Sequence, residues 1–196
     1  METKPSYYVH PSSIVDTTDI GPNTTIWAFV HVLNNVAIGA NCNICDHCFI
    51  EGGVVIGNNV TLKSGIYLWT GVSIEDDAFL GPNVVFTNDV RPRSKQYPSE
   101  FLSTLICKGA SIGANSTVLA GVRIGRYAMS GVGSVITRSV PDHALVYGNP
   151  ARQHGWVDKQ GNKLVSHGQG QWYSEKGELY IETDSGLVSS ADIIDK

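Results

Sequence analysis

The chain has 196 residues, 16% of them charged, and a formal net charge of −4 at pH 7. This length fits one main domain with a small appendage, and the weakly acidic balance argues against a nucleic-acid or membrane partner. No stretch is apolar and long enough to span a bilayer, and residues 1–8 lack a signal-peptide core, so a cytoplasmic protein is expected.

Aliphatic residues recur at every sixth position through most of the chain, and we call these the ladder positions. The first run contains Ile14, Ile20, Ile26, Val32, Ile38, Ile44, Ile50, Ile56, Leu62, Leu68, Ile74, Leu80 and Phe86. The spacing resumes later with Ile106, Ile112, Val118, Ile124, Ser130 and Ile136. A period of six fits neither an amphipathic helix nor a simple strand, and it is typical of a hexapeptide solenoid.

The neighbours of each ladder position predict the shape of the repeat. A small or β-branched residue stands two positions earlier, as Val36 does before Ile38, and glycine often follows, as Gly39 does. Glycine and asparagine tolerate the positive φ of tight corners, so each hexad predicts a short strand and a corner. Three hexads make one triangular coil. We therefore predict an all-β fold, a left-handed parallel β-helix of about six coils over residues 8–152.

A long loop interrupts the repeat at residues 87–105. Phe86 and Ile106 are 20 residues apart, which is not a multiple of six, so the chain must leave the coil and return. Loops of this length usually have a function. Residues 18 apart stack in such a solenoid, which places Asn88 above Thr70 where the loop begins.

The tail, residues 153–196, has a pattern of its own. Gln171–Ser174 and Glu178–Ile181 flank a short turn and predict a β-hairpin. Residues 1–8 and 186–196 are expected to be loose.

Three cysteines, Cys42, Cys45 and Cys48, lie close to His47 in the sequence. In the hexad register Cys42 and Cys48 fall on successive faces of the triangle and Cys45 takes a corner. Their sulfur atoms therefore point to separate places and cannot form the tetrahedral set that zinc requires. We predict no metal site.

Four segments carry a resemblance to a known family. They are Thr87-Asn88-Asp89, the run from Arg91 to Pro98, the block from Lys108 to Asn115, and Gly148-Asn149-Pro150-Ala151-Arg152. Over about residues 7–165 the chain resembles the nucleotide-linked 3-aminosugar N-acetyltransferases, which act on dTDP-3-amino-3,6-dideoxyhexoses or on UDP-linked 3-aminouronates. The resemblance implies a homotrimer that holds acetyl-CoA in the groove between neighbouring prisms.

The resemblance also implies attack of a neutral sugar amine on the thioester. Asn88 matches the family position whose amide holds an acyl or sugar oxygen. Asp89 and His47, with Asp46 beside it, are the candidates for a general base, since histidine titrates near neutral pH. Two plainer interpretations stay open. Asn88 and Asp89 can serve the corner by binding turn amides, and His47 can be structural, because this family manages without a histidine base.

Basic residues are the candidates for binding acetyl-CoA. Lys108 and Arg126 are 18 apart and predict a two-rung basic strip, while Arg138 is a further candidate. Pro150 and Arg152 belong to the turn that lies near the adenine in this family. Surface arginines are often only solvated.

Ser130 interrupts the aliphatic ladder just before Gly131. Either packing needs a small interior residue here, or the backbone approaches a ligand. In the family the backbone here pairs with pantetheine amides, so both residues are expected contacts.

The loop supplies the expected sugar-nucleotide contacts. Arg91, Arg93 and Lys95 are natural partners of a diphosphate, and Tyr97 can pack on a sugar or base. Thr70, below Asn88, is expected to line the same groove.

The leading prediction is acetyl-CoA-dependent N-acetylation of a dTDP-3-amino-3,6-dideoxyhexose, in surface-glycan or O-antigen assembly. One alternative keeps the chemistry with a UDP-linked 3-aminouronate or with a serine, galactoside or antibiotic acceptor. Another is a non-catalytic solenoid, including the carbonic-anhydrase-like type that needs three converging histidines. The spacings of His10, His31 and His47 are 21 and 16, neither of them 18, which argues against zinc.

Overall fold

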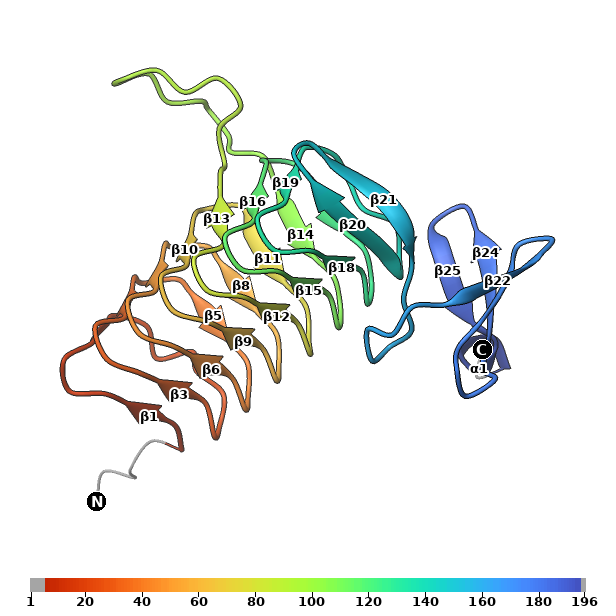
Figure 1. Ribbon diagram of the computed structural model, residues 1–196. Coiled ribbons are helices and arrows are strands. Elements are labelled where there is room, and N and C mark those ends of the chain that lie inside the picture. The colour runs from red at the N-terminus through yellow and green to blue at the C-terminus, as the bar shows by residue number, and fades with distance from the viewer. Residues whose placement is uncertain (1–5, 195–196) are drawn as a thin grey trace.

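The computed structural model describes residues 6–194 and shows a triangular prism of stacked coils with a small sheet at one end (Figure 1). The sides of the prism are sheets of very short parallel strands, to which the antiparallel pair β20–β21 is added at the end, so the predicted all-β solenoid is confirmed. Residues 1–5, on which the expected loose lead-in largely falls, lie outside the described part. No helix among the described residues is long and apolar enough to cross a bilayer.

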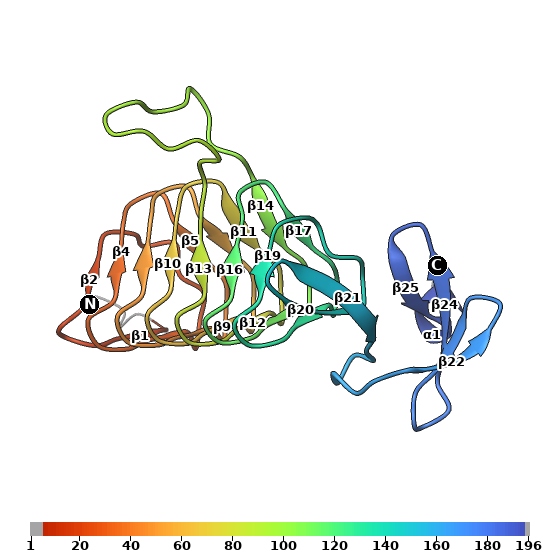
Figure 2. The ribbon, with the colours of Figure 1, turned by 45° about the horizontal axis from the view of Figure 1, so that its top comes forward.

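Three sheets form the prism, and Figure 2 shows their strands side by side. Sheet 1 contains β1 (Tyr8–Val9), β3 (Thr25–Ile26), β6 (Asn43–Ile44), β9 (Thr61–Leu62), β12 (Phe79–Leu80), β15 (Ser111–Ile112), β18 (Met129–Ser130), β20 (Ala144–Gly148) and β21 (Ala151–Trp156). Sheet 2 contains β2 (Ile14–Val15), β4 (His31–Val32), β7 (Phe49–Ile50), β10 (Tyr67–Leu68), β13 (Val85–Phe86), β16 (Thr117–Val118) and β19 (Val135–Ile136). Sheet 3 contains β5 (Ala37–Ile38), β8 (Val55–Ile56), β11 (Val72–Ile74), β14 (Thr104–Ile106) and β17 (Arg123–Ile124).

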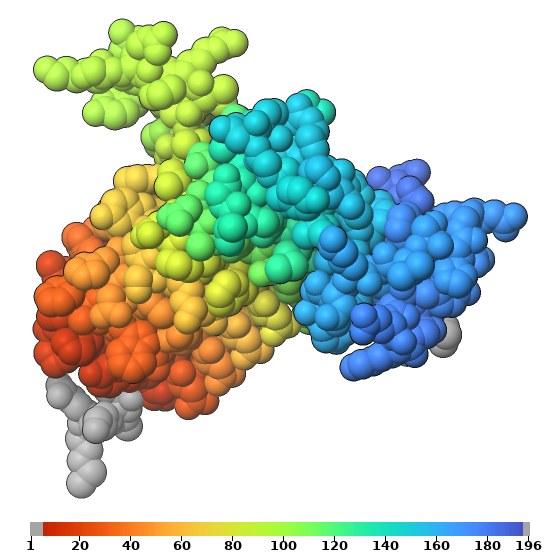
Figure 3. All heavy atoms as spheres, in the orientation of Figure 1, coloured from red at the N-terminus to blue at the C-terminus, as the bar shows by residue number. Residues whose placement is uncertain are grey.

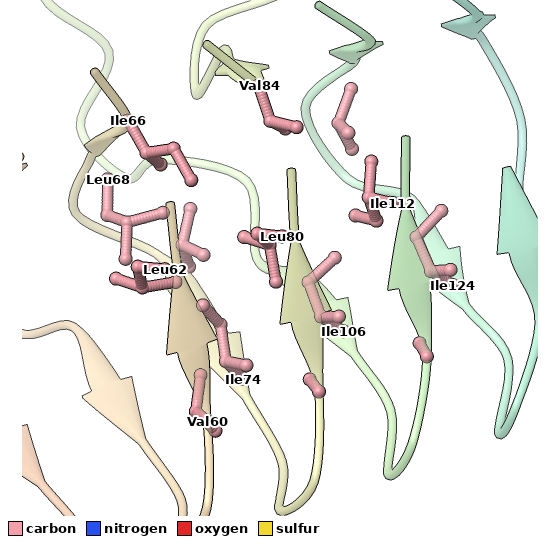
Figure 4. Close-up of a cluster of buried hydrophobic side chains, with 14 of the residues drawn as sticks. Val60, Leu62, Ile66, Leu68, Ile74, Leu80, Val84, Ile106, Ile112 and Ile124 are labelled. Atoms are coloured by element: carbon pink, nitrogen blue, oxygen red, sulfur yellow. The ribbon is translucent and has the colours of Figure 1, made fainter. Parts of the chain in front are cut away.

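The ladder side chains fill the interior of the prism. Leu62, Leu80 and Ile112 are completely buried and point between the strands in Figure 4. The positions two residues earlier, such as Val60, are buried as well. Burying one such side chain stabilises the fold by about 1.5–3 kcal/mol, so the repeated hexad accounts for the main core.

One ladder residue, Ile14, is misplaced in the prediction. Its side chain is 58% exposed, and the neighbouring Val15 pairs with Val32. The spacing of these partners is 17 rather than 18, so the first coil is one residue short. A strict period of six cannot distinguish two adjacent aliphatic residues.

The corners have the positive φ that the sequence predicts. Asparagines occupy this conformation at Asn23, Asn35, Asn41, Asn59, Asn83 and Asn115. Among the described residues, four with aromatic side chains do so too, although a bulky side chain is strained there. They stack in pairs: Phe29 lies on His47 with ring centroids 5.1 Å apart, and Tyr127 lies on His143 at 5.2 Å.

Three edges separate the sheets, and we name each by one feature. The histidine edge joins sheet 1 to sheet 2 and includes residues 45–48, 113–116 and 131–134. The loop edge joins sheet 2 to sheet 3 and includes residues 51–54, 69–71 and 87–103. The tail edge joins sheet 3 to sheet 1 and includes residues 75–77, 107–109, 125–127 and 141–143. Residues 87–103 form the long loop, which stands clear of the body (Figure 3).

Sheet 4 follows the prism in the chain. It contains β22 (Val165–Gly168), β23 (Gln171–Tyr173), β24 (Leu179–Thr183) and β25 (Gly186–Ser189), and α1 (Ser190–Ile194) follows it. The predicted hairpin is the antiparallel pair β23–β24. The expectation that residues 186–196 are loose is wrong for residues 186–194, because Leu187 and Ser189 are buried. Residues 195–196 lie outside the described part.

Sheet 4 is attached to the tail edge through Asp142. The backbone N–H of Asp142 donates to Ser185 O at 2.9 Å, and that of Leu187 donates to Asp142 O at 3.0 Å. Gly186, with φ of 127°, lies against Asp142 so closely that a Cβ atom would collide with its backbone. His143 then packs edge-on against the buried Tyr180 at 5.1 Å.

Candidate active site

Asn88 lies at the loop edge, on top of the predicted column. Its Nδ2 atom donates to Thr70 O at 3.4 Å, and the Thr70 hydroxyl lies 2.9 Å from Gly52 O. The stacking at 18-residue spacing is therefore confirmed. Because the bond from Asn88 is long and the side chain is only half-buried, its amide can still donate to a ligand.

The sequence analysis missed Glu51, which fixes this corner from below. Its Oε2 atom accepts hydrogen bonds from the backbone N–H of Thr70 at 2.7 Å and from the Thr70 hydroxyl at 2.9 Å. Trp69 braces the same corner by donating its indole N–H to Phe86 O at 3.0 Å. Glu51 is 19 residues from Thr70, so a strict 18-residue column does not select it. The Thr70 hydroxyl is already bonded, and its predicted sugar contact lacks a free donor.

Asp89 begins the loop. Its Oδ1 atom accepts the backbone N–H of Arg91 at 2.7 Å, which is an Asx-type turn. The plainer interpretation of Asp89, a carboxylate that satisfies a turn amide, accounts for this geometry.

His47 lies on the histidine edge, exposed and stacked on Phe29. No hydrogen bond joins its ring to Asp46 or to any other described residue, so nothing orients it as a base. Asn88 stands on the opposite edge of sheet 2, higher in the stack. Five residues of extended chain separate the two columns, roughly 16 Å. One protomer does not bring His47 and Asn88 together.

The predicted sugar-nucleotide residues of the loop are all exposed. Tyr97 is 83% exposed, and Arg93 donates from Nη1 to Pro92 O at 2.8 Å. Arg91 and Lys95 are exposed on the same projecting segment. The loop points away from its own prism, so these side chains do not contact the prism of the same protomer.

Lys108 and Arg126 lie on the tail edge and form adjacent rungs, as predicted. Tyr127 N donates to Lys108 O at 3.0 Å, and both basic residues line a cavity of about 590 Å³ beside sheet 4. Lys108 Nζ is 3.6 Å from Asp77 Oδ2. This edge is not the one that holds Gly131, so the structure does not bring the basic strip together with the other expected acetyl-CoA contacts.

Ser130 belongs to the core. It is 2% exposed, and its hydroxyl accepts the backbone N–H of Gly113 at 3.0 Å, which agrees with the packing interpretation. The side chain itself does not reach the surface. Gly131 donates its N–H to Val146 O at 2.8 Å. That amide is therefore unavailable to pantetheine. A Cβ atom on Gly131 would lie 2.8 Å from Tyr147 Cβ, which explains the glycine.

Arg138 and Arg152 come together at the end of the prism. Both line a hollow of about 280 Å³ between the last corner of the loop edge and β21. Pro150 lies in the exposed turn that joins β20 to β21. Arg138 and Arg152 are thus grouped, whereas Pro150 does not line the hollow.

The cysteines occupy separate sites. The Cys42 thiol donates to Gly57 O at 3.1 Å and the Cys48 thiol to Lys63 O at 3.4 Å. Burial raises the pKa of Cys48 to about 11, so this thiol stays protonated and is a poor metal ligand. Among the described residues, no three histidine, cysteine, aspartate or glutamate side chains are grouped so that they could hold a metal ion.

The outer face of sheet 2 is apolar and aromatic. His31 packs on Phe49 at 5.6 Å, and Phe49 packs on Tyr67 at 6.2 Å. Tyr67 and Val85 are about half exposed, at 51% and 50%. A shallow hollow of about 440 Å³ lies over this column, between His47 and Trp69. Such a patch on a lone prism marks a contact surface.

Comparisons with known proteins agree with this architecture. Residues 17–52 match the model of the bacterial transferase hexapeptide (six repeats), and residues 105–138 match that of the hexapeptide repeat of succinyl-transferase. The dTDP-3-amino-3,6-dideoxy-α-D-galactopyranose 3-N-acetyltransferase of Aneurinibacillus thermoaerophilus is 66% identical over 157 residues, which cover 80% of this chain and 82% of the relative. The chain belongs to the hexapeptide-repeat 3-aminosugar N-acetyltransferases.

More distant relatives place this acetyltransferase in a wider group. The galactoside O-acetyltransferase of Lactococcus lactis is 30% identical over 67% of this chain and 68% of its own length. A solved structure of AntD, an N-acyltransferase from Bacillus cereus in complex with dTDP and coenzyme A, has a TM-score of 0.61 at 18% identity, over 79% of this chain and 84% of that one. At this identity the likeness to AntD shows the shared fold.

Proposed function

We propose that this acetyltransferase transfers the acetyl group of acetyl-CoA to the 3-amino group of a dTDP-3-amino-3,6-dideoxyhexose, and that the sugar is the galacto isomer. The observation that carries the proposal is the 66% identity to an enzyme named for that reaction. A role in surface-glycan assembly and a cytoplasmic location are expectations that accompany this substrate.

In this mechanism Asn88 stabilises the transition state. The neutral sugar amine attacks the thioester carbon, and the carbonyl oxygen becomes an oxyanion. The amide N–H of Asn88, held at the corner by its bond to Thr70 O, donates to that oxygen. The intermediate collapses, the C–S bond breaks, and the departing thiolate takes the proton released by the new ammonium group. No side-chain base is required.

We further propose that three copies assemble with their sheets 2 facing the common axis. The half-exposed column of Phe49, Tyr67 and Val85 supplies the apolar contact surface. This arrangement sets the histidine edge of one copy against the loop edge of the next. Asn88 of one copy then faces the histidine edge of the next, two coils above His47, which is roughly 10 Å along the stack. The projecting loop with its exposed Tyr97 reaches the neighbouring prism.

The test is release of thiol from acetyl-CoA with a panel of acceptors. The panel contains dTDP-3-amino-3,6-dideoxygalactose, its gluco isomer and UDP-linked 2-acetamido-3-aminoglucuronate. We expect the galacto sugar to give the highest kcat/KM. Preference for the gluco isomer would correct the sugar, and turnover of the uronate alone would overturn the dTDP assignment.

A further inference from the structure

Glu51 is a half-buried carboxylate at the loop edge, and no ion pair joins it to a described lysine, arginine or histidine. Its hydrogen bonds in the described part of the chain go to one residue. The Oε2 atom accepts the backbone N–H of Thr70 at 2.7 Å and the Thr70 hydroxyl at 2.9 Å. A charged acceptor makes these bonds stronger than bonds between neutral groups, so Glu51 holds Thr70 firmly.

The backbone N–H of Thr70 depends on Glu51 for its hydrogen bond. Within residues 6–194 no other atom accepts this N–H. The hydroxyl is different, because Gly52 O offers it a second acceptor at 2.9 Å. Loss of the carboxylate would therefore leave the N–H unpaired, and the backbone of the corner would have to move or admit water.

The carbonyl group of Thr70 holds the side chain of Asn88. The amide nitrogen of Asn88 carries two hydrogens, and one of them is directed at Thr70 O, 3.4 Å from Nδ2. This bond turns the second hydrogen away from the corner, where a ligand can accept it. Because the bond is long and therefore weak, it orients the amide only while the backbone of Thr70 stays in place.

Other contacts at this corner secure the backbone of the loop rather than the amide of Asn88. The N–H of Leu102, on the returning end of the loop, donates to Asn88 O at 3.4 Å. Thr87 accepts the N–H of Ala120 on its hydroxyl at 3.0 Å. Among the described residues, the hydrogen bond to Thr70 O alone fixes the Asn88 side chain.

We propose that Glu51 is a positioning residue for the acetyl transfer, which holds the backbone of Thr70 and thereby directs the amide N–H of Asn88 at the acyl oxygen. The proposal rests on the proposed function for the role of Asn88 as the oxyanion donor. Glu51 itself touches neither the sugar nor the thioester. Its loss therefore lowers kcat and leaves the KM for acetyl-CoA unchanged.

Steady-state kinetics of single variants test this role. In Glu51→Ala we expect kcat to fall about tenfold, less than the loss of about 10²-fold in Asn88→Ala, because the donor is misaligned rather than removed. Glu51→Gln retains most of kcat, since its amide oxygen can accept both hydrogens from Thr70. Glu75→Ala is the matched control. Glu75 Oε2 accepts the backbone N–H of Lys108 at 2.8 Å on the tail edge, so its loss leaves kcat unchanged.

The double variant Glu51→Ala/Asn88→Ala separates positioning from a merely structural role. If Glu51 acts through Asn88, the kcat of the double variant equals that of Asn88→Ala to within about twofold. A further tenfold loss in the double variant would overturn the proposal, because Glu51 would then act independently of Asn88. An unchanged kcat in Glu51→Ala, or an equal loss in Glu75→Ala, would overturn it as well.

Hydrogen exchange tests the contact itself without any substrate. The amide of Thr70 should lose protection in Glu51→Ala and keep it in Glu51→Gln, and equal protection in both would contradict the proposal. Failure of the proposed function has a different result. An unchanged kcat in Asn88→Ala would overturn the oxyanion role together with the positioning role, whereas an unchanged kcat in Glu51→Ala alone would overturn only the latter.

Discussion

Asn88 is the residue on which the proposed chemistry depends most. Asn88→Ala should lower kcat by about 10²-fold, because the variant loses the N–H that donates to the oxyanion. Asn34→Ala is the matched control, since Asn34 lies in the same column three coils lower and should not affect the reaction. Steady-state kinetics of both variants make the comparison, and an unchanged kcat in Asn88→Ala would remove this residue from the mechanism.

His47 is the second residue for which kinetics are decisive. Its φ of 61° suits asparagine, so His47→Asn should keep the corner intact. If the thiolate collects the proton, most of the activity remains. A fall of more than about 10³-fold, measured across pH, would instead establish general-base catalysis by this imidazole.

For single residues, the sequence predicts the position in the stack better than it predicts the hydrogen-bond partners of the side chain. The column of Asn88 over Thr70 follows from the period alone. Glu51 was missed because its side chain bonds one position away from its own column, to Thr70 N. For Ser130 the period shows an interrupted ladder but cannot choose between packing and a ligand contact, because it does not show the hydrogen bond from Gly113 to the hydroxyl.

At the element scale, the attachment of sheet 4 should depend on pH through His143. Burial between Tyr127 and Tyr180 lowers the pKa of this imidazole, although its hydrogen bond to Val157 O and the nearby Asp142 act in the opposite direction. The stabilisation is therefore complete above the unfolded pKa of about 6.5 and is lost as the pH falls below it toward the folded pKa.

Hydrogen exchange measures this effect directly. The amide of Leu187, bonded to Asp142 O, should lose protection, measured as the ratio of its intrinsic to its observed exchange rate, as the pH falls below about 6.5, the pKa of an unfolded histidine. His143→Asn tolerates the φ of 63° and removes the titrating group, so its protection should not change with pH in this range. The same pH dependence in both proteins would contradict the role of His143.

The elements of the prism were predictable and those beyond it only in part. Each hexad carries its own strand and corner signals, whereas the order of residues 186–194 depends on contacts with Asp142, far earlier in the chain. The pattern of neighbouring residues in the sequence does not predict such a long-range contact. The error at Ile14 also comes from a contact that the sequence does not show. Only pairing with β4 determines that Val15, rather than Ile14, aligns with the buried Val32.

At the scale of the whole molecule, assembly should depend on the outer face of sheet 2. Tyr67→Glu puts a charge into the proposed interface and should give monomers with little activity, as measured by light scattering and thiol release. Phe79→Glu is the control, since Phe79 is 40% exposed on the outer face of sheet 1. A fully active Tyr67→Glu trimer would exclude this face. The aromatic positions were visible in the sequence, but a single chain cannot show what covers them.

The chain reverses direction between β20 and β21, which ends the stack of coils and therefore fixes the length of the prism. The resemblance implies that acetyl-CoA lies in the groove between prisms, so we expect the number of coils to set the length available to the donor. Inserting one 18-residue coil between His47 and Gly131 would lengthen that span by about 4.8 Å. Such a protein should fold, because each coil of a solenoid contacts only its immediate neighbours. Turnover of acetyl-pantetheine should persist. The advantage of acetyl-CoA over acetyl-pantetheine should disappear, and its persistence would show that the coil count does not measure the donor.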